Sequence, residues 1–328
     1  MKKFINDPMK VADEMVEGFL AMRGDSTRKL ETSRVIVRKD APAANKVAVV
    51  TGGGSGHEPA LLGYVGKGML DAVVVGEIFT SPPPGAILDA IKATHSGKGV
   101  LLLLGNYAGD KMNFQMAADL AQLEGIAVEQ SIADDDVGSG PSDRRGVAGE
   151  FFIWKITGAR AEAGGSLQEC LEVSKKVNSL ARTFGVAISP CTVPAKGTPT
   201  FTLAEDEMEY GVGHHGEAGL ERIKTMPVDQ VVERMADAII EDLPFRKGDE
   251  VAVLINGLGA TPVCELYIVY RKVKQMLDAR GIVVFRPYVG EYFTALEMAG
   301  FSITLLKVDA ALKGLLAAPC DTLAHQVV

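Results

Sequence analysis

The chain has 328 residues, of which 47% are hydrophobic and 23% are charged, and it carries a formal net charge of −8. This length allows two domains with separate cores. The acidic balance argues against nucleic acid or an anionic membrane as the main partner, since both need clustered Lys and Arg. The four cysteines lie far apart without metal-ligand spacing, and we expect reduced thiols in a cytoplasmic protein with neither a signal peptide nor a membrane span.

The N-terminal half alternates predicted strands with predicted helices. Its strands are rich in Val and Leu without polar alternation, which is typical of a sheet that is buried on both faces. This half is therefore predicted to be α/β. The predicted strands cover residues 46–51, 72–75, 99–104 and 126–132, and the predicted helices cover residues 59–67, 85–95, 111–124, 145–163 and 166–182.

A second α/β pattern follows a segment rich in Pro, Thr and Gly at residues 190–202. We place the boundary near residue 184, which gives an N-terminal domain 1–184 and a C-terminal domain 185–328. The predicted fold is two α/β domains, each a largely buried sheet flanked by helices. In the second half, strands are predicted at residues 185–189, 251–255, 282–287 and 302–308, and helices at residues 228–241 and 261–279.

A glycine-rich stretch, Gly52-Gly-Gly-Ser-Gly-His-Glu-Pro59, separates the first clear strand from a predicted helix. Glycines let backbone N–H groups converge on a small ligand, and a helix start adds partial positive charge. The stretch lacks the lysine of a Walker loop, and it fits neither the dinucleotide pattern nor the nucleophile elbow. The alternative is a plain tight turn between strand and helix.

Polar side chains follow three of the predicted strands. His57, Ser81 and Asp110 each come shortly after a strand end. Because ligands bind at the carboxyl ends of strands in an open α/β sheet, these side chains converge if the strands are parallel neighbours. Asp110 also directly precedes the helix predicted at 111–124, so it has the alternative role of an N-cap, worth roughly 1 kcal/mol.

Two further polar motifs allow both a functional and a structural interpretation. His214 and His215 are adjacent, so in extended backbone they point to opposite sides, and they form a poor metal pattern. The alternatives are two solvated loop histidines or a close-fitting, glycine-rich loop over a pocket. The acidic triplet at 134–136 is interpreted as a solvated turn rather than a magnesium site, and Arg144-Arg145 as the start of a helix with stems on the surface.

Ordered sequence blocks run along nearly the whole chain. Through these blocks the chain resembles the dihydroxyacetone kinase family, specifically its substrate-binding K part. The blocks are Gly52-Gly-Gly-Ser-Gly-His-Glu-Pro59, Gly76-Glu-Ile-Phe-Thr-Ser-Pro82, Asn106-Tyr107 with Gly109-Asp110, Asn113-Phe114, Arg144-Arg-Gly-Val-Ala148, Cys191-Thr-Val-Pro194, Glu207-Met-Glu-Tyr-Gly-Val-Gly213, His215-Gly-Glu217, Asn256 with Leu258-Gly-Ala-Thr-Pro262, and Gly300-Phe-Ser-Ile-Thr-Leu-Leu-Lys-Val-Asp309.

The resemblance implies that a short-chain ketose, dihydroxyacetone or a relative, binds as a covalent hemiaminal on His215. It also implies that His57 and Asp110 act on the substrate hydroxyls, as hydrogen-bonding partner and general base. A neutral imidazole is a competent nucleophile near neutral pH, and a positioned aspartate can accept a hydroxyl proton. The remaining pocket residues implied by the resemblance are Gly54, Ser55, Gly56 and Ser81.

The resemblance also implies partners. No nucleotide motif or metal site is recognised in this chain, and ADP or ATP with Mg²⁺ is expected on a separate L-type subunit. The donor is either ATP or a tightly held ADP that a phosphoprotein of the sugar phosphotransferase system recharges. We further expect a homodimer and a role in glycerol metabolism.

Two departures from the family pattern affect specificity. Gly105 stands where the family often has a lysine, and His214 stands where it often has an apolar residue, so His214 receives no role. Loss of a long cation at position 105 enlarges the pocket, which makes a four-carbon ketose such as erythrulose an alternative substrate. A further alternative is a non-catalytic ketose sensor that acts as coactivator of a transcription regulator.

Overall fold

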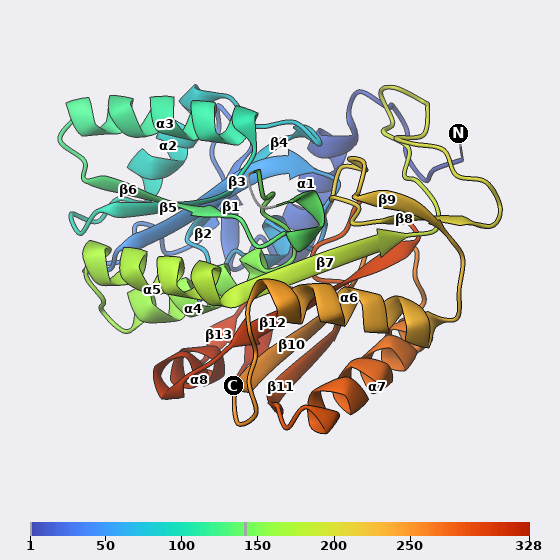
Figure 1. Cartoon of the computed structure of the whole chain (residues 1–328). Coiled ribbons are helices and arrows are strands. Elements are labelled where there is room, and N and C mark those ends of the chain that lie inside the picture. The colour runs from blue at the N-terminus through green and yellow to red at the C-terminus, as the bar shows by residue number, and fades with distance from the viewer. Residues whose placement is uncertain (1, 141–142) are drawn as a thin grey trace.

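The computed structural model of the protein describes residues 2–140 and 143–328. The described strands form two six-stranded sheets, each with helices packed against it (Figure 1). This arrangement confirms the predicted α/β class. The first sheet has the strand order β1-β2-β4-β3-β5-β6, and the second has the order β11-β10-β12-β7-β8-β9.

In the first sheet, strands β3 to β6 are parallel, whereas β1 and β2 join one side as antiparallel strands. The strands predicted in this half correspond to β3–β6, and the short β1 and β2 were missed because three or four residues carry too little pattern. The bounds are β1 (Thr27–Lys29), β2 (Val35–Arg38), β3 (Ala48–Ser55), β4 (Ala72–Ile78), β5 (Val100–Gly105) and β6 (Val128–Ala133).

Both faces of this sheet are buried, as the uninterrupted apolar strands indicate. Along β3, Val49 faces one core while its neighbours Ala48 and Val50 face another. Helices α2 (Pro84–Thr94) and α3 (Ala108–Leu123) cover the outer face, and α4 (Glu150–Glu162) and α5 (Leu167–Leu180) lie against the inner one. Helix α1 (Val11–Arg23) also contributes to the inner core.

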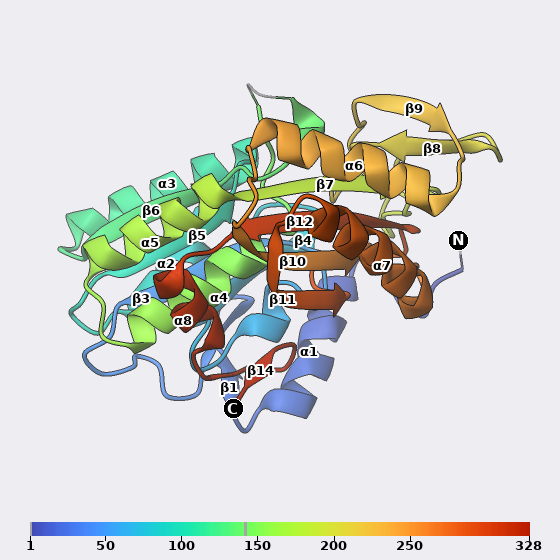
Figure 2. The ribbon, with the colours of Figure 1, turned by 60° about the horizontal axis from the view of Figure 1, so that its bottom comes forward.

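The second sheet is antiparallel except for the pair β10–β11. Helices α6 (Val228–Asp242) and α7 (Val263–Ala279) pack on one face of it. Figure 2 shows both of them on the side of the second sheet that faces away from α4. The strand bounds are β7 (Ala181–Ala187), β8 (Glu207–Tyr210), β9 (Glu221–Lys224), β10 (Glu250–Gly257), β11 (Val283–Gly290) and β12 (Gly300–Lys307).

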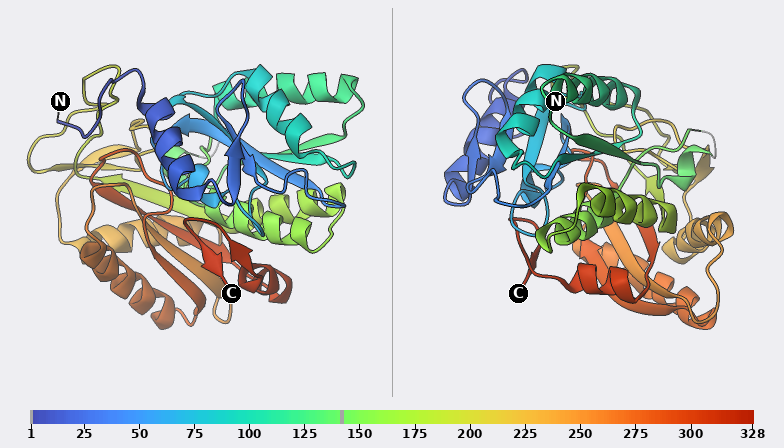
Figure 3. Two further views of the ribbon diagram at one scale, coloured as in Figure 1. Left: turned by 180° about the vertical axis from the view of Figure 1, so that it is seen from behind. Right: turned by 90° about the vertical axis from the view of Figure 1, so that its left-hand side faces the viewer.

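Helix α4 lies between the two sheets (Figure 3) and is buried on nearly every side. Phe151, Phe152 and Trp154 pack in one cluster with side chains of β3 and β5 and with Ala252 and Leu254 of β10. The two sheets therefore share a core around α4, which begins at Glu150 rather than near residue 145 as predicted.

The C-terminal segment returns to the first half of the chain. After α8 (Ala310–Ala317), the hairpin of β13 (Cys320–Asp321) and β14 (Gln326–Val327) lies against residues 63–67, where Asp321 N–H donates to Lys67 and Ala324 N–H to Gly63. Residue 184 itself lies inside β7. The division at residue 184 remains a proposal, and a division that keeps β7 whole falls before Ala181.

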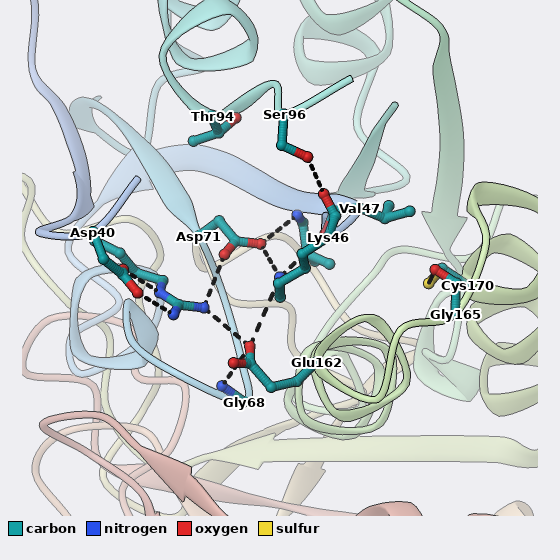
Figure 4. A network of polar contacts seen from close by, with 12 residues as sticks. Asp40, Lys46, Val47, Gly68, Asp71, Thr94, Ser96, Glu162, Gly165 and Cys170 are labelled. Atoms are coloured by element: carbon teal, nitrogen blue, oxygen red, sulfur yellow. Dashed lines mark hydrogen bonds and ion pairs between the residues drawn. The ribbon is translucent and has the colours of Figure 1, made fainter. Parts of the chain in front are cut away.

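A buried ionic network ties α4 to the first sheet (Figure 4). Asp71 pairs with Lys46 and, at 3.1 Å, with Arg38, and it also accepts the backbone N–H of Val49 at 2.8 Å. Arg38 reaches Glu162 at the end of α4 at 3.0 Å. Each charge is paired, which is the condition under which buried charges are tolerated.

The helix predicted at residues 59–67 is wrong. Strand β3 runs through the glycines to Ser55, and the following segment contains turns and a single short 3₁₀ helix, Leu62–Tyr64. The backbone of residues 59–67 instead forms local hydrogen bonds, for example from Ala60 N–H to the His57 carbonyl. The same segment packs on the C-terminal segment. The glycine-rich sequence has low helix propensity, and tertiary contacts decide its path.

Candidate active site

A pocket opens where β3, β4 and β5 end and where the β8–β9 connection, residues 211–220, covers them. An inner cavity of about 30 Å³ is lined by Gly53, His57, Gly105, Glu150 and His214, among others. An outer cleft of about 500 Å³ is lined by Phe79, Ser81, Asn113 and others. Both parts are bordered by three predicted site residues, Gly54, Asp110 and His215.

The glycines of β3 serve close packing at the pocket wall. A Cβ on Gly54 would lie 2.5 Å from the backbone nitrogen of Thr80, and one on Gly52 would lie 2.7 Å from the carbonyl oxygen of Val74. Only glycine allows the turn after β4 to approach so closely. In the part of the chain that the structure describes, no helix follows β3 directly, so the helix start predicted beside these glycines is wrong.

Ser55 and Gly56 lie behind the wall rather than on the surface of either cavity. The Ser55 hydroxyl donates to the Gly76 carbonyl at 2.6 Å and joins the ends of β3 and β4. Gly56 has a φ of 98° and donates its N–H to the Glu58 carboxylate at 3.1 Å. Ser81, by contrast, borders the outer cleft, where Asn113 Nδ2 donates to its hydroxyl at 3.3 Å.

Asp110 does not cap a helix. Helix α3 begins at Ala108, so Asp110 lies in its first turn, and the N-cap position is held by Tyr107. Among the described residues, none forms a hydrogen bond to the buried Oδ1 atom of Asp110. Burial raises the pKa of this carboxyl, although the Ser81 hydroxyl opposes the effect. An unpaired oxygen beside the pocket fits a base better than a cap.

His57 is buried and fixed in one orientation. Its Nδ1 atom lies 2.8 Å from the Thr294 carbonyl oxygen, so Nδ1 carries the proton and donates it. The Nε2 atom is therefore left as an acceptor. Burial and the nearby His215 lower the pKa of His57 to about 3, so the ring is neutral at ordinary pH.

His215 is positioned by Glu217 and by aromatic rings. Its Nδ1 atom lies 2.7 Å from Glu217 Oε1, and its backbone N–H donates to Oε2 at 2.9 Å. Although burial raises the pKa of Glu217, the hydrogen bond from His215 holds it well below its usual value. The His215 ring contacts His57, Phe79 and Tyr107 edge-on, with centroid distances of 4.8–4.9 Å.

His214 borders the same pocket as His215. Only 3% of its surface is exposed, and its ring lies 5.9 Å from that of His57 and 4.1 Å from that of Phe293. The interpretation as two solvated histidines that face opposite sides is therefore wrong. The backbone here is a turn rather than extended, with Gly216 N–H donating to the Gly213 carbonyl.

The loop that carries these histidines is tied to the first half of the chain. Arg145 pairs with Asp136 and donates to the Gly211 carbonyl at 2.8 Å. Asp135 accepts the backbone N–H groups of Val147 and Gly149. Two members of the acidic triplet, Asp135 and Asp136, are thus buried rather than solvated, and Arg145 is buried rather than on the surface.

Three residues at the pocket were missed. Glu150 had no signal in the sequence, since an acid in the first turn of a helix usually serves the helix dipole. Tyr107 and Glu217 lie within family blocks but received no role. Among residues 2–140 and 143–328, no cluster of three or more metal-ligating side chains occurs. Within the same part of the chain, the helices are too short or too polar to cross a membrane.

Comparison with known proteins places the chain in a family. The model of the Dak1 domain matches residues 17–324. The chain belongs to the Dak1 family. Among its relatives, a Listeria innocua protein named PTS-dependent dihydroxyacetone kinase 1, dihydroxyacetone-binding subunit DhaK, is 47% identical over 99% of this chain and 100% of its own length. The Mycolicibacterium smegmatis D-erythrulose kinase is 40% identical over 99% of this chain and 57% of that protein.

Solved structures of this Dak1 family agree with the observed fold. The dihydroxyacetone kinase of C. freundii superposes with a TM-score of 0.89 at 35% identity, covering 99% of this chain and 60% of that one. A protein described as the dihydroxyacetone kinase operon co-activator Dha-DhaQ gives a TM-score of 0.92 at 32% identity, covering 97% and 99% of the two chains. The family thus includes both kinases and a co-activator.

Proposed function

We propose that this Dak1 protein is the ketose-binding subunit of a dihydroxyacetone-type kinase. The observation that carries the proposal is the His215–Glu217 pair, which faces Asp110 and His57 across one pocket. It supports a covalent attachment point on one wall and proton-handling groups on the other. The names of the closely similar relatives support dihydroxyacetone, or another short ketose, as the substrate.

Attachment follows from the tautomer of His215. With Nδ1–H directed at Glu217, the lone pair of Nε2 is free to attack the ketone carbon. A C–N bond forms and the C=O π bond opens to a hydroxyl group. The carbonyl oxygen gains one proton and Nδ1 gives one up through the Glu217 carboxylate, which ends the step unprotonated, so the net change is the transfer of one proton from nitrogen to oxygen. The product is a neutral hemiaminal that keeps every atom of the ketose.

Phosphoryl transfer then uses the opposite wall. The tethered ketose presents a terminal hydroxyl, and tethering removes much of the entropy cost of a two-body reaction. Asp110, with its free Oδ1 atom, accepts the hydroxyl proton as phosphorus is attacked. His57 accepts a hydrogen bond from a ketose hydroxyl through Nε2. Gly54 and Ser81 border the path, whereas Ser55 and Gly56 shape the wall from behind.

The phosphoryl donor belongs to a partner in this proposal. ADP or ATP with Mg²⁺ is held by a separate L-type subunit, and the name of the Listeria relative favours a phosphotransferase-system phosphoprotein as the source of the phosphoryl group. The outer cleft of about 500 Å³ leaves room for that subunit to deliver the phosphoryl group. We also propose a homodimer that acts in glycerol metabolism. A cytoplasmic location is supported by the four unpaired cysteines.

A second function is favoured by one comparison. The similarity to the co-activator supports a ketose-binding sensor that contacts a transcription regulator. Such a sensor also needs the hemiaminal, so attachment alone does not separate the two functions. Presence of Asp110 at the pocket favours the kinase, because a sensor has no proton to remove.

The test begins with attachment. We expect native mass spectrometry of the chain with dihydroxyacetone to show a gain equal to the whole ketose, without loss of water. Ketose labelled with ¹³C at the carbonyl should lose its carbonyl resonance on binding. His215→Asn should abolish both signals and lower kcat/KM by about 100-fold or more, while His95→Gln, outside the pocket, should change neither.

Adding an L-type subunit with either donor then separates kinase from sensor. Phosphorylated ketose is expected. An adduct without any phosphorylation by either donor contradicts the kinase, and absence of an adduct with every short ketose contradicts the whole proposal.

A further inference from the structure

His214 borders the inner cavity of the pocket, and the reaction above gives it no task. Only 3% of its surface is exposed. Within the described part of the chain, neither its Nδ1 nor its Nε2 atom has a hydrogen-bond partner. Buried polar groups are nearly always hydrogen-bonded, and an orphan group costs free energy unless a ligand or water satisfies it. The ring therefore calls for a polar group in the cavity beside it.

The charge of the His214 ring limits what that group can be. Burial, with the neighbouring His57 and His215, lowers the pKa of His214 well below its usual value, so the ring is neutral. A neutral imidazole offers one donor and one acceptor. A hydroxyl group can match either nitrogen, whereas an anion can only accept. An uncharged hydroxyl is therefore the group that the ring fits best.

The His214 ring is also held in place before any ligand binds. It contacts the Phe293 ring edge-on, with a centroid distance of 4.1 Å. The turn that carries it is closed by the hydrogen bond from Gly216 N–H to the Gly213 carbonyl. A side chain that is already ordered loses little entropy when it binds a ligand.

Two polar side chains beside His214 already have protein partners. The Tyr107 hydroxyl donates to the Gly146 carbonyl at 3.1 Å, and Nδ1 of His57 lies 2.8 Å from the Thr294 carbonyl oxygen. Both borders of the cavity are thus tied to the backbone, while His214 keeps its two nitrogen atoms unpaired.

The proposed reaction fixes which end of the ketose reaches His214. The phosphoryl group arrives through the outer cleft, so the hydroxyl that receives it lies there, beside Asp110. With the carbonyl carbon held by His215, which borders both cavities, the third carbon points toward the inner one. The inner volume of about 30 Å³ compares with roughly 15 Å³ for one water-sized group, so it admits a CH₂OH group and nothing larger.

We propose that His214 binds the hydroxyl of the third ketose carbon, the one that is not phosphorylated, so that the pocket selects ketoses with a hydroxyl on each side of the carbonyl. This role rests on the proposed function, because it needs a ketose held on His215. His214 thus determines specificity and takes no part in proton or phosphoryl transfer. A site built to bond a hydroxyl discriminates against the analogue that lacks it, because its own polar group is then left unpaired.

The test compares dihydroxyacetone with hydroxyacetone, which lacks one of the two hydroxyls. Dihydroxyacetone always places a hydroxyl beside His214, whereas hydroxyacetone can place its methyl group there. Calorimetry of the intact chain gives the ratio of the two dissociation constants. The change of this ratio between variants cancels the different reactivity of the two ketones.

We expect His214→Leu to raise the dissociation constant of dihydroxyacetone about tenfold and that of hydroxyacetone by less than about twofold. His214→Gln, whose amide both donates and accepts, should retain most of the wild-type ratio. Thermal unfolding checks that each variant folds, and His214→Met replaces His214→Leu if the latter does not.

An unchanged ratio in the apolar variant, or equal losses for both ketones, overturns the role of His214. A ratio in His214→Gln as low as that in His214→Leu overturns it too, since a lost shape rather than a lost hydrogen bond would then explain the change. Failure of the proposed function looks different, because neither ketone then forms an adduct with the wild type.

Discussion

The two walls of the pocket are built by different means. The wall from the first sheet consists of strand ends and the first turn of α3, and its shape is fixed by backbone packing around Gly54 and Thr80. The opposite wall is the irregular loop 211–220, held by Arg145 and by aromatic contacts of His215. In the proposed reaction, the first wall handles protons and hydroxyls, and the second supplies the covalent attachment. Under this proposal, regular structure positions the base, whereas a loop brings the nucleophile to it.

The largest expected effect separates the chemistry of the two walls. Asp110→Asn should lower kcat by about 100-fold or more, since it removes the base while keeping the side-chain shape. The hemiaminal should persist, because His215 and Glu217 are untouched. Steady-state kinetics with the L-type subunit and native mass spectrometry measure the two effects. Asp119→Asn, an exposed position of the same helix, is the matched control. Unchanged turnover in Asp110→Asn contradicts its role as base.

An intermediate effect tests the packing of the first wall. Gly54→Ala should destabilise the protein by about 1–3 kcal/mol, because the new Cβ meets the Phe79–Thr80 backbone. Gly18→Ala lies inside α1 with no heavy atom within 4 Å, and it should raise stability by about 0.5–1 kcal/mol. Urea unfolding measures both changes. Equal stability of the two variants indicates that the close approach at β3 is not a constraint.

The smallest expected effect concerns the electrostatics between the walls. The pKa of His57 is lowered from 6.5 to about 3 in the folded protein, so the unfolded chain binds more protons in that window. Stability from the neutral ring is present above the unfolded pKa and is lost as pH falls below it. The free energy of unfolding falls through this group by at most about 1.4 kcal/mol per pH unit.

His57→Asn removes this proton linkage, so its stability should fall less steeply on acidification than that of the wild type. Urea unfolding between about pH 7 and pH 5 gives the two slopes. His214 titrates in the same direction and is retained in both proteins, so the difference reports His57. Parallel slopes contradict a buried neutral His57.

The sequence by itself determined the alternation of strands and helices and the family blocks that carry His57, Asp110 and His215. These features are local: apolar runs specify buried strands, and residues after parallel strands meet at one edge. The same local rules failed at residues 59–67, where contacts with the C-terminal segment replace the predicted helix.

Only the tertiary structure decided which residues meet in the pocket. Adjacent histidines turn toward one cavity because loop 211–220 is held from outside itself, by Arg145 of the first half. Glu150 reaches the cavity because Gly105, distant in sequence, leaves space for its carboxyl. Such pairings depend on the packing of β5 against α4 and of two sheets around a shared core. The periodicity of a single segment does not predict them.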